Sequence, residues 1–198
     1  MDRLLARLER KLGRFAIEGL IRYIVGGMAI VFVLGLVRPE FVGMLQFEPQ
    51  LALRQPWRLV TFLFIPQTWS LLWVFFSRYF TWRVGASLES EWGSFKFNVY
   101  YLLGAIGTAG AAWITGDPQG SFWLHTSLFF AFATVFPNYE LFLFFILRVK
   151  VKWLALLSFV FVLFQFVQGD LGVKAAIGVA LGNYLLFFSG HLVGLFRG

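Results

Sequence analysis

Long apolar stretches constrain the fold of this chain more than any other feature of its sequence. A helix needs about 20 mostly apolar residues to cross a bilayer. Six stretches approach that length, and prolines, glycines or charged residues interrupt the chain between them. They cover residues 20–37, 70–88, 97–115, 122–136, 153–167 and 175–193. We therefore predict an all-α membrane protein with six transmembrane helices, of which the fourth and fifth are short.

The composition excludes the alternatives to a membrane protein. Apolar residues make up 59% of the chain and charged residues 14%, whereas soluble domains carry roughly 45–50% and about 25%. A soluble chain of 198 residues has too little interior to bury so much apolar surface. The absence of cysteine from the sequence excludes a disulfide framework and thiol chemistry.

Two further apolar stretches are not expected to cross. Residues 59–65 are too short and are followed at once by Pro66. In residues 141–151 an apolar run gives way to alternating apolar and basic positions, which is typical of extended backbone. An extended strip would place its cations against lipid headgroups, and the alternative is an extension of the fifth helix. The cations of this basic strip are Arg148, Lys150 and Lys152.

The chain divides into an N-terminal segment, a membrane domain and a short tail. Residues 1–19 have leucines at three- and four-residue spacing among basic residues, which predicts an interfacial amphipathic helix. No small-residue cleavage site follows the first apolar stretch, so we interpret it as a signal anchor. Residues 20–194 form the membrane domain, and residues 195–198 form a cytoplasmic tail.

The basic residues predict the orientation in the membrane. If the N-terminus is cytoplasmic, eleven of the 17 Lys and Arg residues lie on the cytoplasmic side and four on the far side, while Arg78 and Arg83 fall inside the second stretch. Cytoplasmic loops carry the excess of Lys and Arg. Both termini are therefore predicted to be cytoplasmic. The net charge of +7 reflects this orientation, and we expect no nucleic-acid partner.

Three features inside the apolar stretches need an explanation: a charge, a glycine pair and an amide. Arg78 lies about 12 Å into its helix at the usual rise, and a charge at that depth marks either a functional interior or a structural ion pair. Gly178 and Gly182 form a GxxxG pair that would let another helix approach closely. Asn183 beside them needs a hydrogen-bond partner within the bundle. For these three residues of the sixth stretch we favour a structural role.

Catalytic and metal chemistry are not expected. The two histidines, His125 and His191, lie near opposite ends of their helices. Ser127 is close to His125 in sequence, but its side chain points in another direction, and no serine is placed within hydrogen-bond reach of a histidine. Two separated histidines without cysteine do not form a metal-ligand cluster. We expect no metal and no cofactor.

Three segments resemble the rhomboid superfamily, in particular its derlin-like branch. Residues 55–64 read QPWRLVTFLF, with the Trp-Arg pair at Trp57 and Arg58. Residues 85–104 read GASLESEWGSFKFNVYYLLG, with Glu89, Trp92 and Gly93 in family positions. Residues 136–156 read FPNYELFLFFILRVKVKWLAL and resemble the Phe-Pro turn and basic stretch of bacterial rhomboids. The resemblance implies a six-helix rhomboid-like bundle in a bacterial inner membrane.

The chain departs from active rhomboid proteases at both catalytic motifs. Their Gly-x-Ser-Gly motif is replaced by GSFWLHTS at residues 120–127. Their Ala-His-x-x-Gly motif is replaced by GVALGNYLLF at residues 178–187, with Gly182 and Asn183 near the histidine position. Even if Ser121 took the nucleophile position, no base would meet it. The resemblance therefore implies a pseudoprotease and not an enzyme.

The same resemblance implies a function in binding. Derlins bind membrane-protein segments through a lateral opening and thin the bilayer, which implies a role in membrane-protein quality control. Arg78, Trp57, Arg58 and Glu89 would be the client-binding candidates, with Trp92 and Gly93 as a structural motif. The partners would be membrane lipids and other transmembrane proteins. A small transporter or channel component and a lipid-interacting scaffold stay open as alternatives.

Overall fold

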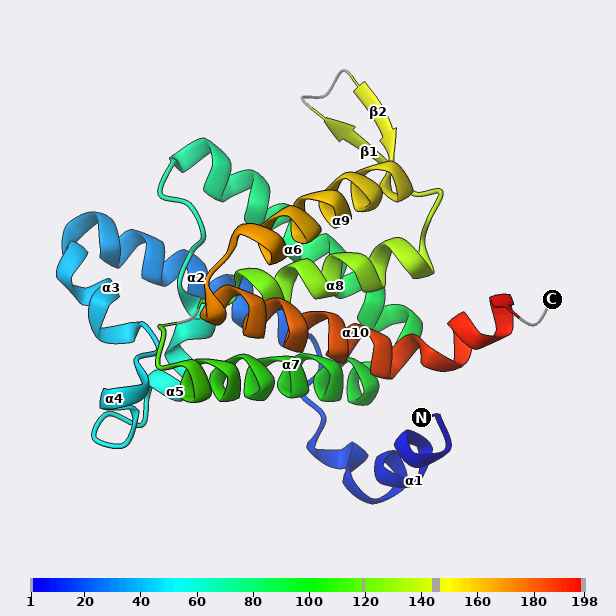
Figure 1. The fold of residues 1–198 in the computed structure, drawn as a ribbon, viewed down its shortest axis with the longest axis horizontal. Helices are drawn as coiled ribbons and strands as arrows, with labels where there is room; N and C mark the ends of the chain where they lie inside the picture. Colours follow the sequence, from blue (N-terminus) through cyan, green and yellow to red (C-terminus); the bar gives the residue numbers. More distant parts are fainter. Residues whose placement is uncertain (1, 119, 144–146, 197–198) are drawn as a thin grey trace.

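The computed structural model of the chain describes residues 2–118, 120–143 and 147–196. Its long helices occupy the predicted apolar stretches (Figure 1). Arg38 and Pro39 end the first of them, and Gly116, with a φ of 77°, ends the third. A positive φ is accessible to glycine at little cost. The long helices are α2 (Leu20–Val37), α6 (Leu71–Trp92), α7 (Ser94–Thr115), α8 (Phe122–Val135), α9 (Val151–Gln168) and α10 (Leu171–Phe196).

Among the described residues, four helices are long and apolar enough to cross a membrane: α2, α7, α9 and the Leu171–Phe188 part of α10. The chain is therefore a multi-pass membrane protein with an α-helical bundle. Helix α8 has 14 residues, about 21 Å of helix, against a hydrocarbon core of about 30 Å. Helix α6 has 22 residues, but it carries both arginines and acidic residues. The six predicted crossings thus also include α6 and α8, which are not among these four helices.

The centre of the bundle is α7. It packs against α10, α6 and α8, and Figure 1 shows α7 and α10 side by side. Helix α6 also packs against α2 and α8, so it lies inside the assembly despite its charges. The aromatic side chains of Phe97, Tyr100 and Tyr101 on α7 are completely buried. By contrast, α9 contacts α8 and α10 only along one side, and 11% of its residues are buried.

Shorter elements occupy the two ends of the bundle. At one end, which we call the first-loop end, lie three short helices and a 3-10 turn (Figure 1). At the other end, the N-terminal end, lie α1 and its following turn. The predicted amphipathic helix is present as α1, and its Leu5 is buried against the bundle. These elements are α3 (Pro39–Leu45), α4 (Pro49–Ala52), α5 (Arg58–Thr61), η2 (Phe62–Phe64), α1 (Asp2–Leu12) and η1 (Gly13–Phe15).

A β-hairpin projects from the N-terminal end between α8 and α9 (Figure 1). Strands β1 (Glu140–Leu143) and β2 (Leu147–Lys150) pair antiparallel, with Glu140 opposite Lys150. The prediction of an extended segment is confirmed for these residues. It is wrong for Lys152, which lies in the first turn of α9. The chain becomes helical at Val151, so the three cations of the basic strip do not share one extended face.

Candidate functional site

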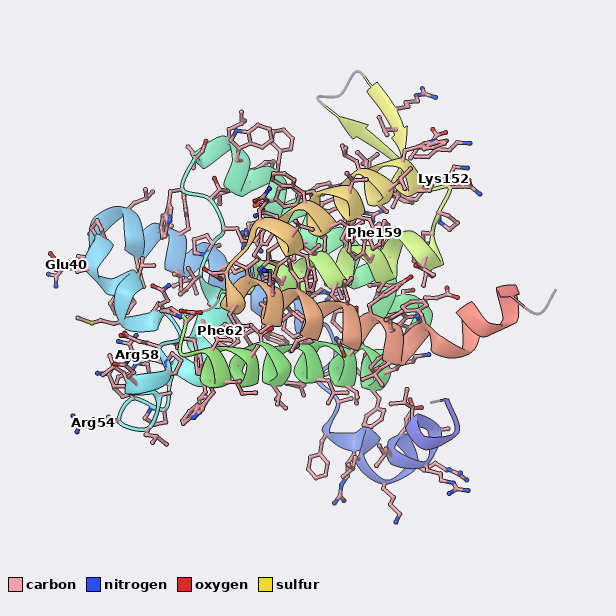
Figure 2. All side chains as sticks on the ribbon, in the orientation of Figure 1. Glu40, Arg54, Arg58, Phe62, Lys152 and Phe159 are labelled. Carbon is pink, nitrogen blue, oxygen red and sulfur yellow. The ribbon has the colours of Figure 1, made fainter. Side chains whose placement is uncertain are left out.

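Arg58 is buried at the first-loop end, where it holds the loop in place. Its guanidinium donates hydrogen bonds to the backbone oxygens of Gly43 (2.8 Å) and Gln46 (2.7 Å), and to Oε1 of Gln55 (2.6 Å). Figure 2 shows Arg58 among the loop helices. Because these bonds direct the guanidinium into the loop and the side chain is 5% exposed, Arg58 has a structural role here, and its contact with a client stays a prediction.

Trp57 lies beside Arg58 but on the surface. Its side chain is half exposed, and its indole N–H donates to the backbone oxygen of Met44 at 3.3 Å. The ring is thus oriented without being buried. Amphipathic aromatic side chains favour the membrane–water interface, so Trp57 is suited to the headgroup region. Its contact with a client stays a prediction.

Glu89 joins the start of α2 to the junction of α6 and α7. One carboxylate oxygen, Oε1, accepts hydrogen bonds from the backbone N–H of Gly19 and from the hydroxyl of Ser94, both at 2.7 Å. Gly93 separates the two helices with a φ of 82°. Trp92 packs its ring against three aromatic residues of α7 and α10. Glu89 therefore connects the parts of this junction, as Trp92 and Gly93 do, and its contact with a client stays a prediction.

Asn98 reinforces the same junction and was not singled out from the sequence. Its amide nitrogen donates to the backbone oxygen of Ile17 at 2.9 Å, and its amide oxygen accepts from the Ile17 N–H at 3.1 Å. This two-way pairing attaches the segment before α2 to α7 across 81 positions of sequence. A lone asparagine in an apolar stretch carries no local signal that identifies such a distant partner.

Arg78 points into the bundle. Its side chain is 7% exposed, and Nη1 contacts the thioether sulfur of Met28 on α2. Its Nε has no hydrogen-bond partner. Among the described residues no carboxylate pairs with it. The guanidinium does not lie on the outer face of α6, so a client could meet it only inside the bundle.

A chain of polar groups leads from the first-loop end toward this arginine. The exposed amide of Gln67 bonds Nδ1 of His125 at 3.0 Å, and Nε2 of His125 lies 3.3 Å from the hydroxyl of Tyr101. Tyr101 lies on α7 and His125 on α8, and both helices pack against α6, which carries Arg78. From the sequence, His125 was considered only as a catalytic base or a metal ligand. Gln67 and Tyr101 were missed because they come from a loop and from α7, which only the folded chain brings to His125 on α8.

The serines near α8 form no nucleophile–base pair in the described part of the chain. The Ser127 hydroxyl bonds the hydroxyl of Tyr100. The Ser121 hydroxyl is buried without a hydrogen-bond partner. His125 bonds Gln67 and Tyr101 instead. The side chain of His191 lies outside the described residues. The described geometry therefore offers no activated serine for covalent catalysis, which needs hydrogen-bond reach.

The two glycines of the GxxxG pair on α10 have no close helix contact in the part of the chain that the structure describes. A Cβ at Gly178 or Gly182 would meet nothing described within 4 Å. The close approach occurs instead on α7, where a Cβ at Gly107 would lie 2.4 Å from Cγ1 of Val179. Among the described residues the GxxxG pair has no close neighbour, and the approach of another helix to it stays a prediction. Asn183 does find a partner in the bundle, since its amide donates to the Tyr100 backbone oxygen at 3.1 Å.

The basic strip is divided between two elements. Arg148 and Lys150 lie on β2, while Lys152 on α9 stacks its ammonium 5.6 Å from the ring of Trp153. Figure 2 shows Lys152 at the base of the hairpin. The strip thus keeps its position at one end of the bundle, where headgroups would lie, and its binding to lipid stays a prediction.

Among the described residues, no group of three or more His, Cys, Asp or Glu side chains could hold a metal ion. Comparison of the chain with protein-family models, with curated proteins and with solved structures finds no match. The resemblance to rhomboids therefore depends on the three sequence segments alone. The distinctive chemistry of the interior is a permanent positive charge beside a hydrogen-bonded tyrosine and histidine.

Proposed function

We propose that this chain is a non-catalytic, rhomboid-like membrane protein that binds transmembrane segments of other proteins. The exposed apolar face of α9 is the observation that carries this proposal. Only 11% of α9 is buried, against 39–50% for the other three candidate spans. A shallow groove on α9 is lined by Leu157, Val160, Phe161 and Phe164, with Ser158 among them. An apolar groove of this kind fits the side chains of one transmembrane helix.

The neighbouring face of α6 supports the same proposal. Its first two turns expose Leu72 and Phe75, although the inward side of the helix is buried. Helices α6 and α9 both pack on α8. A client helix entering between them would contact both apolar faces. This is the place of the lateral opening that the rhomboid resemblance implies.

The proposed topology has six crossings with both termini in the cytoplasm. Helix α6 supports it because its 22 residues suffice to cross and its inward side packs against α2, α7 and α8. Helix α8 would cross as the shortest span. A span of about 21 Å favours local bilayer thinning through hydrophobic mismatch. Thinning next to the client site would ease the movement of a client segment, in keeping with a role in membrane-protein quality control in a bacterial inner membrane.

Site-specific photo-crosslinking tests the proposal. A photoreactive amino acid is introduced at Leu157 on α9 and at Phe75 on α6, which are 68% and 69% exposed. Ile106 on α7, 67% exposed, is the matched control on another face. We expect adducts with other membrane proteins at the first two positions and lipid adducts alone at Ile106. Lipid adducts alone at all three positions would overturn the proposal.

The absence of catalysis has a separate test. A fluorophosphonate probe reacts with activated serines, and we expect no labelling of this protein. The hydrogen bond that Ser127 makes with Tyr100 supports this expectation, because a histidine base is not its partner. Probe labelling that is lost in Ser121→Ala or Ser127→Ala, together with cleavage of a transmembrane substrate, would show an enzyme instead.

A lipid-interacting scaffold is the second candidate, and α1 favours it. Helix α1 and the turn after it expose Leu8, Leu12 and Phe15, although Leu5 docks on the bundle. Basic residues accompany this apolar edge, as in helices that lie in anionic membrane surfaces. The basic strip would add to the same attraction. If the protein is a scaffold, replacing Arg148, Lys150 and Lys152 by glutamine should lower its binding to anionic-lipid vesicles. Unchanged vesicle binding would count against the scaffold.

A further inference from the structure

The guanidinium of Arg78 is a buried charge without a matching anion. It lies seven residues into α6, about 10 Å from the start of the helix. Its described contacts are the thioether of Met28, which is a weak acceptor, and the electrostatic influence on Tyr101 and His125. Nε is buried and donates to nothing. The neutral side chains of Tyr101 and His125 carry no negative charge that could compensate the guanidinium.

Such an arrangement is costly unless something compensates the charge. An arginine side chain stays protonated in proteins, so it cannot escape the cost by losing its proton. Removing a charge from water without a partner is strongly unfavourable. Charged residues at membrane depth are accordingly paired or face a functional interior. The described residues provide no carboxylate for Arg78, so its charge is free to pair with an anion from outside them.

The chemistry of the free edge indicates what that group is. The Nε side of a guanidinium presents two parallel N–H donors, which match the two oxygens of a carboxylate. The Tyr101 hydroxyl and the His125 ring, which lie 3.3 Å apart, belong to two helices that pack against α6. Both can add a hydrogen bond to an oxyanion. The Gln67 amide connects this cluster to the exposed loop, and thereby marks a polar route from the first-loop end.

We propose that Arg78, with Tyr101 and His125, forms a binding site for a carboxylate group that enters from the first-loop end of the bundle. The carboxylate accepts hydrogen bonds from the guanidinium and neutralises its charge. No proton transfer or bond cleavage is involved. The site consists of the buried arginine and its neighbours alone. Carboxylate binding there does not require that the groove on α9 binds clients.

Thermal unfolding of the purified full chain in nonionic detergent tests this site, with sodium formate as the probe. Formate replaces chloride at constant sodium concentration. We expect a saturable rise in the unfolding midpoint, about 3–6 °C at a formate concentration tenfold above its dissociation constant. An effect of ionic strength would shift the unfolding midpoint of every variant equally. A formate-dependent rise that is lost in one variant only therefore identifies the residue that binds formate.

Arg78→Met removes the charge and keeps a long apolar side chain. We expect it to lose the formate response while its midpoint in chloride equals or exceeds that of the wild type, because an uncompensated buried charge is gone. Arg54→Gln, at an exposed arginine of the first-loop end, should keep the full response. An arginine with a purely structural role would instead show a lower midpoint in Arg78→Met and no formate effect in the wild type.

Two results overturn the proposal: a wild type without a formate-specific rise, or Arg78→Met with an undiminished one. If Arg78→Met does not fold, Arg78→Lys takes its place in the experiment. The lysine ammonium lacks the planar fork of the guanidinium, so this variant should show a weaker response to formate. A single-span peptide with a central glutamate, compared with its glutamine counterpart, separates the carboxylate sources. Competition with formate by the glutamate peptide alone assigns a membrane segment, and no competition assigns a small solute.

Discussion

Arg58 shows how one side chain organises the first-loop end. Three acceptors converge on its guanidinium, and two of them are backbone oxygens of the segment around α3. We predict that Arg58→Met lowers the free energy of unfolding by about 3 kcal/mol, because it leaves buried acceptors without donors. The measurement is thermal unfolding of the purified protein in detergent.

The matched control for this prediction is Arg54→Met, four residues earlier in the same loop. Figure 2 places Arg54 at the outer edge of the loop, and its side chain is exposed. Substitutions at exposed positions usually change stability by no more than about 0.5 kcal/mol. An equal loss in both variants would mean that any charge removed from this loop destabilises it, and that the three hydrogen bonds of Arg58 are not the cause.

Residues such as Arg58, Glu89 and Arg78 also show where sequence reasoning stops. The rhomboid-like segments singled out Arg58 and Glu89, and depth in an apolar stretch singled out Arg78. Neither signal gives the direction in which the side chain points. Glu89 binds Gly19 across 70 positions of sequence, and Arg78 contacts Met28 across 50. Such partners are set by which helices become neighbours. A motif identified along the chain carries no information about that choice, so the structural contacts of these side chains could not be predicted from it.

At the scale of elements, glycines distinguish the packed from the open faces of the helices. A Cβ at Gly107 would overlap Cγ1 of Val179, a β-branched side chain with little freedom to move. We predict that Gly107→Ala costs about 1–3 kcal/mol through overpacking between α7 and α10. Gly110→Ala on the same helix should be neutral or stabilising by up to about 1 kcal/mol, because its Cβ position is open.

The GxxxG pair of α10 extends this prediction. Gly178→Ala and Gly182→Ala should behave like Gly110→Ala, since nothing lies within 4 Å of either Cβ position. Unfolding midpoints of the variants in detergent provide the measurement. A loss at Gly178 as large as that at Gly107 would contradict the prediction, and would indicate that a helix of another molecule packs on this face.

The helices themselves were largely predictable because their limits are local. Leu20–Val37 has the predicted limits, and the other long helices extend the predicted ranges by a few residues or match them closely. Prolines, glycines and charges interrupt helical backbone wherever they occur in the fold. The hairpin was predicted only as an extended strip, because the alternation on β2 is local but its pairing with β1 is not. Lys152 then joined α9 once helical backbone began at Val151.

At the scale of the whole molecule, the arrangement of the helices predicts which segments share a side of the membrane. Lys11 on α1, Glu91 at the end of α6 and Lys150 on β2 belong to the N-terminal end of the bundle. Arg54 and Asp170 belong to the opposite end (Figure 1). With six crossings, the first three positions are cytoplasmic and the last two are not. The sequence contains no cysteine, so single cysteines can report these sides without a background.

We therefore predict that a membrane-impermeant thiol reagent added to intact cells labels Arg54→Cys and Asp170→Cys. It should label Lys11→Cys, Glu91→Cys and Lys150→Cys only after the membrane is permeabilised. Glu91 decides between the six-crossing topology and one in which only α2, α7, α9 and α10 cross. If α6 did not cross, the start of α7 would lie on the same side as the end of α2, and Glu91→Cys would be labelled from outside together with Arg54→Cys. That result would remove α6 from the spans, and with it the rhomboid-like topology on which the client site between α6 and α9 depends.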